Sequence, residues 1–329
     1  MNRVAWILAG LFVVLVVVLI FVFADDDDDG DATTTIGDTT TTTLVGASTT
    51  VGGTSTTEDV TTTTTGETTT TTEATTTTAG LEGNWAEDPI VMAGFGALGW
   101  WDGSNWVQVE PGSDLPLTGN ESYQVAFLGR QAIITGSSPV TLCEPLDNPG
   151  VVLDNEELLG DFPGPYGVAI SAPWELVPHL VEDLDDDGTY AAFAGELLAE
   201  RGMNVPDPVI KQLLRVDLDG DGVNDVLVVA EDVSEGLFGE VGDYSIAFIR
   251  STVSGDVQTA ILGESVIVSD DEVPLVYSFS IGAVADLNGD GRMEIVVSSG
   301  YYEGLGVEVW EWIDDDQGPV PRIAQGCGA

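Results

Sequence analysis

Two short acidic segments in the last third of the chain carry the oxygen-bearing side chains that a hard metal cation requires. They read Asp217-Leu-Asp-Gly-Asp-Gly-Val-Asn-Asp225 and Asp286-Leu-Asn-Gly-Asp-Gly-Arg-Met-Glu294, and they lie 69 residues apart. Side chains at positions 1, 3 and 5 can converge on one point, a glycine at position 6 permits the sharp turn, and a carboxylate at position 9 closes the shell. Calcium takes about six to eight oxygen ligands, so the pattern predicts calcium.

The predicted ligands are seven acids and one amide: Asp217, Asp219, Asp221 and Asp225 in the first segment, and Asp286, Asn288, Asp290 and Glu294 in the second. An EF-hand has a glutamate at position 12, but Val228 and Val297 stand there, so the position-9 carboxylates must complete each site. The competing interpretation is a solvated Asp-Gly turn between strands. Two full matches in one register favour the calcium sites.

With the apolar residues that follow them, these segments resemble the FG-GAP and VCBS-type repeats of integrin-α-like propellers. The resemblance implies blades of antiparallel strands in which the loop joins two strands and binds calcium structurally. It places repeats at about residues 212–262 and 277–313. Residues 212–329 also resemble uncharacterised exported bacterial proteins with such repeats, a likeness that implies no activity. Two repeats leave open a partial or small propeller and a smaller β-rich domain.

The rest of the globular region is predicted to be mainly β, with blade-like antiparallel sheets and one or two short helices. Short β-branched and aromatic runs between Gly, Asp and Pro turns indicate strands. These runs are residues 106–109, 123–128, 131–135, 226–230, 244–250, 257–262, 277–280, 295–299 and 307–313. Residues 190–201 are rich in Ala, Leu and Glu and stop at Gly202, which predicts a helix. A second helical turn is expected after Pro208, through Ile210, Leu213 and Leu214.

The residues near the N-terminus have the pattern of a membrane-spanning segment. Residues 4–24 are almost entirely apolar and would span roughly 31 Å as a helix, enough to cross a bilayer core. Arg3 precedes the run and five aspartates follow it, which predicts a single-pass anchor at the cell membrane, with a cytoplasmic N-terminus and an extracellular globular domain. The alternative is a signal peptide cleaved after Ala24, which would make the protein secreted.

Composition divides the remainder in two. Residues 25–80 are rich in Asp and Thr with few apolar residues, which predicts a disordered stalk whose glycosylation would depend on the host. Residues 81–329 form the predicted calcium-binding domain and carry 45 of the 56 acidic residues against 7 of the 8 basic ones. Such a charge excludes nucleic acid as a partner.

Two cysteines, Cys143 and Cys327, lie in the exported part, where an even count favours a disulfide over two unrelated buried thiols. A third acidic run, Asp183 to Gly188, is read as capping the helix that begins near Thr189, with a partial cation site as the alternative. Gly94 to Gly99 matches a dinucleotide fingerprint as a string but lies outside any βαβ unit, so it is predicted to be a flexible turn.

The remaining motifs are less specific. Trp85, Trp100, Trp101 and Trp106 are core residues or a carbohydrate-binding surface. The single histidine, His179, is predicted to be structural, and no nucleophile or metalloprotease signature is present in the sequence. The chain is therefore expected to be a calcium-stabilised binding or adhesion module for an extracellular protein or carbohydrate. The alternatives are a polysaccharide hydrolase or lyase and a structural envelope-layer protein.

Overall fold

The computed structural model describes residues 81–128, 130–160, 165–185, 188–234, 236, 238–253, 255–269, 275–313 and 318–328. The predicted membrane segment at residues 4–24 and the predicted stalk at residues 25–80 lie outside this range. Within the described residues, no helix has the length and apolar character needed to cross a membrane.

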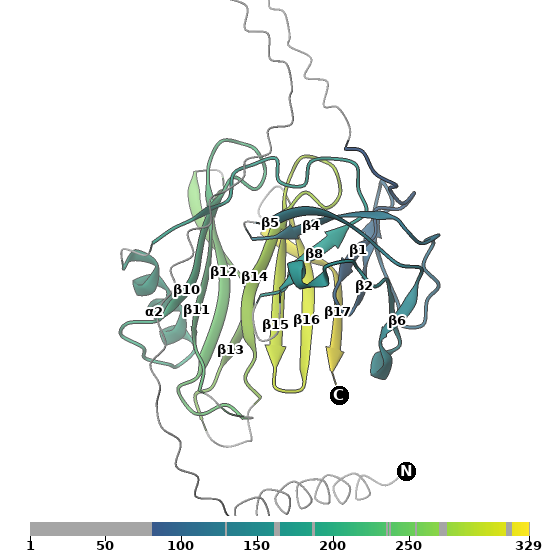
Figure 1. The fold of residues 1–329 in the computed structure, drawn as a ribbon. Coiled ribbons are helices and arrows are strands. Elements are labelled where there is room, and N and C mark those ends of the chain that lie inside the picture. Colours follow the sequence, from purple (N-terminus) through teal and green to yellow (C-terminus); the bar gives the residue numbers. More distant parts are fainter. Residues whose placement is uncertain are drawn as a thin grey trace, which may run out of the picture. The chain divides into compact units, whose positions relative to one another are not determined.

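Three antiparallel sheets make up most of the domain (Figure 1). The N-terminal sheet has the order β3 (Trp106–Gln108), β2 (Gly96–Trp101), β1 (Val91–Ala93), β8 (Val168–Ile170), β4 (Ser122–Phe127) and β5 (Arg130–Thr135). The first repeat sheet consists of β13 (Asp256–Val266), β12 (Tyr244–Val253), β11 (Asp225–Asp232), β10 (Ile210–Val216) and β9 (Glu182–Asp183). The second repeat sheet consists of β14 (Ser278–Ala285), β15 (Glu294–Tyr301), β16 (Gly304–Ile313) and β17 (Gly318–Gly328).

The smaller elements are β6 (Val140–Cys143) paired with β7 (Asn148–Gly150), two 3-10 turns at Glu144–Leu146 and Glu156–Leu159, and helix α2 (Thr189–Glu200). Both repeat sheets contain a four-strand meander, β10 to β13 and β14 to β17, in which each strand pairs with the next along the chain. This is the blade-like arrangement that the sequence predicts. The mainly β fold with antiparallel sheets and one α-helix is therefore confirmed for the described residues.

The second repeat sheet lies between the other two (Figure 1). One of its faces packs on the N-terminal sheet, where Val296 and Val309 meet Leu98 and Ile170. Its other face packs on the first repeat sheet through a cluster that includes Ile295, Val297, Leu227 and Ile249. Because both faces are covered, β14 and β15 are largely buried, and burial of their β-branched side chains is the main stabilising contribution at these interfaces.

Amide side chains fasten neighbouring sheets to each other. Gln212 of β10 accepts a hydrogen bond from the N–H of Ile281 at 2.7 Å and donates to its carbonyl at 3.0 Å. Gln108 makes the same two-way contact with Ala324 of β17, at 2.9 and 2.6 Å. Each pair satisfies backbone groups that would otherwise be left unpaired at a sheet edge.

One close approach of the backbone requires a glycine. The carbonyl oxygen of Tyr166 lies where a Cβ on Gly282 would be, and the N–H of Leu128 donates to the Gly282 carbonyl at 3.1 Å. A larger residue at position 282 would push the N-terminal sheet away from β14.

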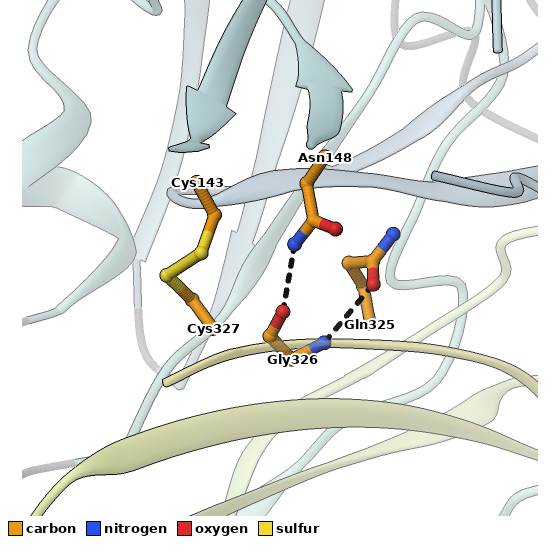
Figure 2. Close-up of a disulfide and its surroundings, with 5 residues drawn as sticks. All are labelled: Cys143, Asn148, Gln325, Gly326 and Cys327. Carbon is orange, nitrogen blue, oxygen red and sulfur yellow. Dashed lines mark hydrogen bonds between the residues drawn. A yellow bond between two sulfur atoms is a disulfide. The ribbon is translucent and has the colours of Figure 1, made fainter. Parts of the chain in front are cut away.

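A disulfide joins Cys143, at the end of β6, to Cys327 in β17, across 184 residues of sequence. Figure 2 shows it beside a second tie, in which the Asn148 amide donates to the Gly326 carbonyl at 2.7 Å. Cys143 is fully buried. The predicted disulfide is confirmed, and it fixes the β6–β7 hairpin to the last strand of the second repeat sheet.

The structure corrects two predictions. Residues 210–214 are not helical: they belong to β10, which pairs with β11 on one edge and β9 on the other. Gly96 to Gly99 are not a flexible turn but buried residues of β2, and only residues 94 and 95 make the turn from β1. The helix predicted at residues 190–201 is confirmed as α2, one residue earlier at each end.

Candidate metal centre

The first acidic loop wraps its backbone around the carboxylate of Asp217. The loop connects β10 to β11, with Val216 and Asp225 as the last paired residues before it. The Asp217 oxygens accept hydrogen bonds from the N–H of Gly220 at 2.8 Å and of Gly222 at 2.9 Å. Both glycines have φ in the left-handed region, at 74° and 86°, which a residue with a Cβ rarely adopts. The glycines thus allow the chain to turn around one side chain.

The second loop repeats this arrangement between β14 and β15. Ala285 and Glu294 are the last paired residues, and the Asp286 oxygens accept from Gly289 at 2.6 Å and Gly291 at 3.0 Å. These glycines also have positive φ, at 79° and 88°. The same fold of the same loop type therefore occurs twice, at the same place in two neighbouring sheets.

The side chains at positions 3 and 5 are oriented in the same way in both loops. Each accepts a hydrogen bond from the N–H two residues further along the chain. In the first loop, oxygens of Asp217, Asp219 and Asp221 all lie within 4.8 Å of one another. That spacing suits a single ion bound at roughly 2.3–2.6 Å, and a donor set made only of oxygen fits calcium rather than zinc or copper.

The position-9 carboxylates are the most buried members of the two sets. Asp225 is 7% exposed and Glu294 is 1% exposed, and each accepts a hydrogen bond from the loop backbone, from Leu218 at 3.2 Å and from Leu287 at 2.6 Å. Burial raises the pKa of Asp225 to about 6 and raises that of Glu294 well above its ordinary value; neighbouring carboxylates add to both shifts. A bound cation would offset this cost of burying negative charge.

If the two loops bind calcium, these pKa values predict that the stabilisation by calcium depends on pH. Below a pH of about 6, protons compete with the ion for Asp225, and the raised pKa of Glu294 acts in the same direction. In chelator, the native state binds more protons than the unfolded state between the unfolded and folded pKa values, so these groups favour folding as pH falls from 7 to 5.

The increment in Tm that calcium adds is therefore expected to shrink over the same pH range. Thermal melts at each pH, with calcium and with chelator, measure it. An increment that is equal at pH 7 and pH 5 would contradict the assignment of the two carboxylates as ligands.

The two loops contact each other. The N–H of Met293 in the second loop donates to the carbonyl of Leu218 in the first at 2.9 Å, and Arg292 forms an ion pair with Asp219 at 3.8 Å. An ion bound by one loop would therefore restrict the backbone of the other. The eight predicted ligands therefore lie in two neighbouring loops.

A segment that precedes both repeats supports the pair of loops. The Trp174 indole N–H donates to the Asp286 carbonyl at 2.9 Å, and the N–H of Asp286 donates to Leu176 at 2.7 Å. His179 Nε2 lies 3.2 Å from the Gly291 carbonyl and also borders Gly220 of the first loop. The only histidine in the chain thus lies between the loops, a position that no signal in the sequence indicates.

The third acidic run lies apart from these two loops in the part of the chain that the structure describes, whereas Trp101 and Trp106 line a pocket together with Arg292 of the second loop. Asp183 of the third acidic run lies in β9, the helix begins at Thr189 as expected, and Asp186 and Asp187 lie outside the described residues. Trp100 packs with the outer-face cluster of the N-terminal sheet and Trp106 with the cluster on its inner face. Trp101 and Trp106 contact each other edge to face with ring centres 5.7 Å apart, whereas Trp100 packs on the opposite face of the sheet.

The comparisons with known proteins agree with the second loop. The model of the FG-GAP repeat family matches residues 278–307, which span β14, the second acidic loop, β15 and the start of β16. No curated protein and no solved structure matches the chain. The resemblance read from the second repeat is thus confirmed by an independent match over that repeat.

Proposed function

We propose that this chain is an extracellular binding module, anchored to the membrane by residues 4–24 and stabilised by two calcium ions. The observation that carries the proposal is the hydrogen-bonding pattern that both acidic loops share, 69 residues apart, in two adjacent sheets. A turn that only reverses the chain direction does not require the side-chain oxygens at positions 1, 3 and 5 to be oriented. Here they are oriented in the same way in both loops. The FG-GAP match supports a propeller-like binding or adhesion role.

The proposed location outside the cell has its own support. The Cys143–Cys327 disulfide suits an oxidising compartment, and an apolar run followed by five aspartates suits export with the N-terminus in the cytoplasm. Cleavage after Ala24 would release the same module into the medium. The stalk of residues 25–80 would hold the module away from the membrane.

The test is thermal melting of residues 25–329 with calcium and with chelator, with the number of bound ions measured in parallel. Extracellular calcium modules bind with dissociation constants of about 0.1–1 mM, so 1 mM free calcium at two sites contributes about 1–3 kcal/mol in total. A domain of this size should then gain roughly 3–10 °C in Tm.

Magnesium at the same concentration serves as the control, because its preference for octahedral geometry and bound water gives a smaller gain. An unchanged melt with no bound calcium would reduce both loops to acidic turns and remove the proposal's main support.

A further inference from the structure

A groove of about 810 Å³ opens between the two repeat sheets, and it lies at the end of the strands opposite to the acidic loops. Its walls include the start of β10 and the end of β11 on one side, and the start of β14 and the end of β15 on the other. The acidic loops follow the end of β10 and the end of β14. Calcium sites and groove are therefore separate features of the same two sheets.

Aromatic rings form the apolar part of the groove and its rim. Tyr301 lies in the middle of a row of aromatic rings: its ring centre is 5.1 Å from that of Tyr277 and 6.0 Å from that of Tyr302. Phe279 contacts Tyr277 at one end of the row, and Phe238 contacts Tyr302 at the other end. Tyr277, Tyr302 and Phe238 are 37%, 39% and 49% exposed. Exposed aromatic rings held in place by their neighbours are typical of a binding surface, because little side-chain entropy is lost on binding.

Hydroxyl groups form much of the polar part. Five serines line the groove: Ser234, Ser278, Ser280, Ser298 and Ser299. Ser280 and Ser298 bond each other at 2.8 Å, whereas the hydroxyls of Ser278 and Ser299 have no hydrogen-bond partner among the described residues. The groove thus offers both apolar faces and, from Ser278 and Ser299, hydroxyls that have no hydrogen-bond partner among the described residues.

The chain's only lysine, Lys211, also lines the groove. Its ammonium group is exposed and forms no ion pair within the described residues, whereas Arg201, Arg215, Arg292 and Arg322 each pair with a carboxylate. Glu231, the acid among the described residues that line the groove, accepts a hydrogen bond from Ser245 at 2.8 Å. A cation that forms no ion pair among the described residues is a local attraction for a carboxylate in so acidic a domain.

Addition of a peptide strand to β14, the edge strand that borders the groove, is blocked by side chains of the chain itself. The N–H groups of Tyr277, Phe279 and Ile281 donate to Ser265, Ser245 and Gln212, at 3.1, 2.8 and 2.7 Å. An incoming strand would find these donors occupied. The ligand must therefore bind through side chains rather than through main-chain pairing.

From these contacts we infer that the groove binds an oligosaccharide that carries a carboxylate, such as a chain of uronic acid units. The apolar faces of the sugar rings would stack on the tyrosines, the sugar hydroxyls would bond to the serines, and the carboxylate would pair with Lys211. This inference rests on the proposed binding function, for which it names the class of ligand.

The test uses the full chain in a detergent without a sugar headgroup, at saturating calcium, with two probes: a galacturonic acid tetrasaccharide and the neutral cellotetraose. Calorimetry is expected to show that the acidic probe binds about tenfold more tightly than the neutral one. Tyr302→Ala should lower the affinity for the acidic probe at least fivefold. Lys211→Gln should lower its affinity about tenfold and leave that of the neutral probe unchanged.

Two variants provide matched controls. Trp101→Ala removes an aromatic ring that lines a different pocket, and Arg215→Gln removes a cation from the same strand as Lys211 but outside the groove. Both should bind the acidic probe as the unmodified chain does, and all variants should keep the calcium-dependent rise in Tm, which shows that they fold.

The outcomes separate the two proposals. No binding of either probe by a chain whose Tm still rises with calcium would overturn the glycan groove and leave the calcium module standing. If Tyr302→Ala bound the acidic probe as tightly as the unmodified chain does, the proposed glycan groove would also be overturned. Binding that depends on Tyr302 but not on Lys211 would support the groove and overturn the role of the carboxylate.

Discussion

Replacing Cys143 and Cys327 together by serine is expected to lower the free energy of unfolding by about 3–5 kcal/mol. The bond closes a loop of 184 residues, so its loss frees much of the domain in the unfolded state. It also weakens the attachment of the β6–β7 hairpin to β17, where the hydrogen bond from Asn148 to Gly326 remains. Urea unfolding of both proteins measures the difference.

The control is the unmodified protein after full reduction, which should unfold at the same urea concentration as the double serine variant. Equal stability of the oxidised protein and the variant would mean that packing alone positions β17. The double variant is preferable to a single one, because a single substitution leaves a free thiol that can form bonds between molecules.

Combining Asp217→Ala with Asp286→Ala is expected to destabilise the domain by at least about 3 kcal/mol in calcium. Each substitution removes the position-1 ligand and two hydrogen bonds from loop N–H groups. These N–H groups belong to exposed glycines and can bond to water instead, so each lost hydrogen bond costs about 0.5–1.5 kcal/mol. The stabilisation by bound calcium is lost as well. The bound-ion count should fall from two to none, and the melt should become the same with calcium and with chelator.

The two single variants should differ in how much they destabilise the domain. Asp286 is 4% exposed whereas Asp217 is partly exposed, so Asp286→Ala removes the more buried side chain and should cost more than Asp217→Ala. Asp183→Asn in β9 is the matched control, since it changes an acid outside both loops and should leave the ion count at two. Two ions still bound by the double variant would place the calcium elsewhere.

The strands of the repeats could be predicted from the sequence because their own residues are apolar and favour the strand conformation. Residues 226–230 and 295–299 are β-branched runs that remain strands wherever they pack. β17 was missed because Gly318, Pro319 and Pro321 interrupt it. It is an edge strand that pairs with β16 alone, and an edge tolerates proline.

The error at β10 has a related cause. Ile210, Leu213 and Leu214 have the spacing of a helix face, but pairing on both edges of the strand outweighs that local preference. The same limit applies to the candidate site. Spacing along the chain predicts which side chains share a loop, whereas the contact between the loops and the position of His179 depend on how separate sheets stack.

The two outer sheets place a limit on how this architecture can grow. Helix α2 covers the face of the first repeat sheet that another blade would need, through Leu198 and Phe248, and Leu153 and Leu159 cover the outer face of the N-terminal sheet. A tandem duplication of the repeat could not simply be appended to either side, because it would first have to displace a cap. These two covering elements therefore limit the number of repeat sheets. A further repeat sheet would have to be inserted between the existing ones.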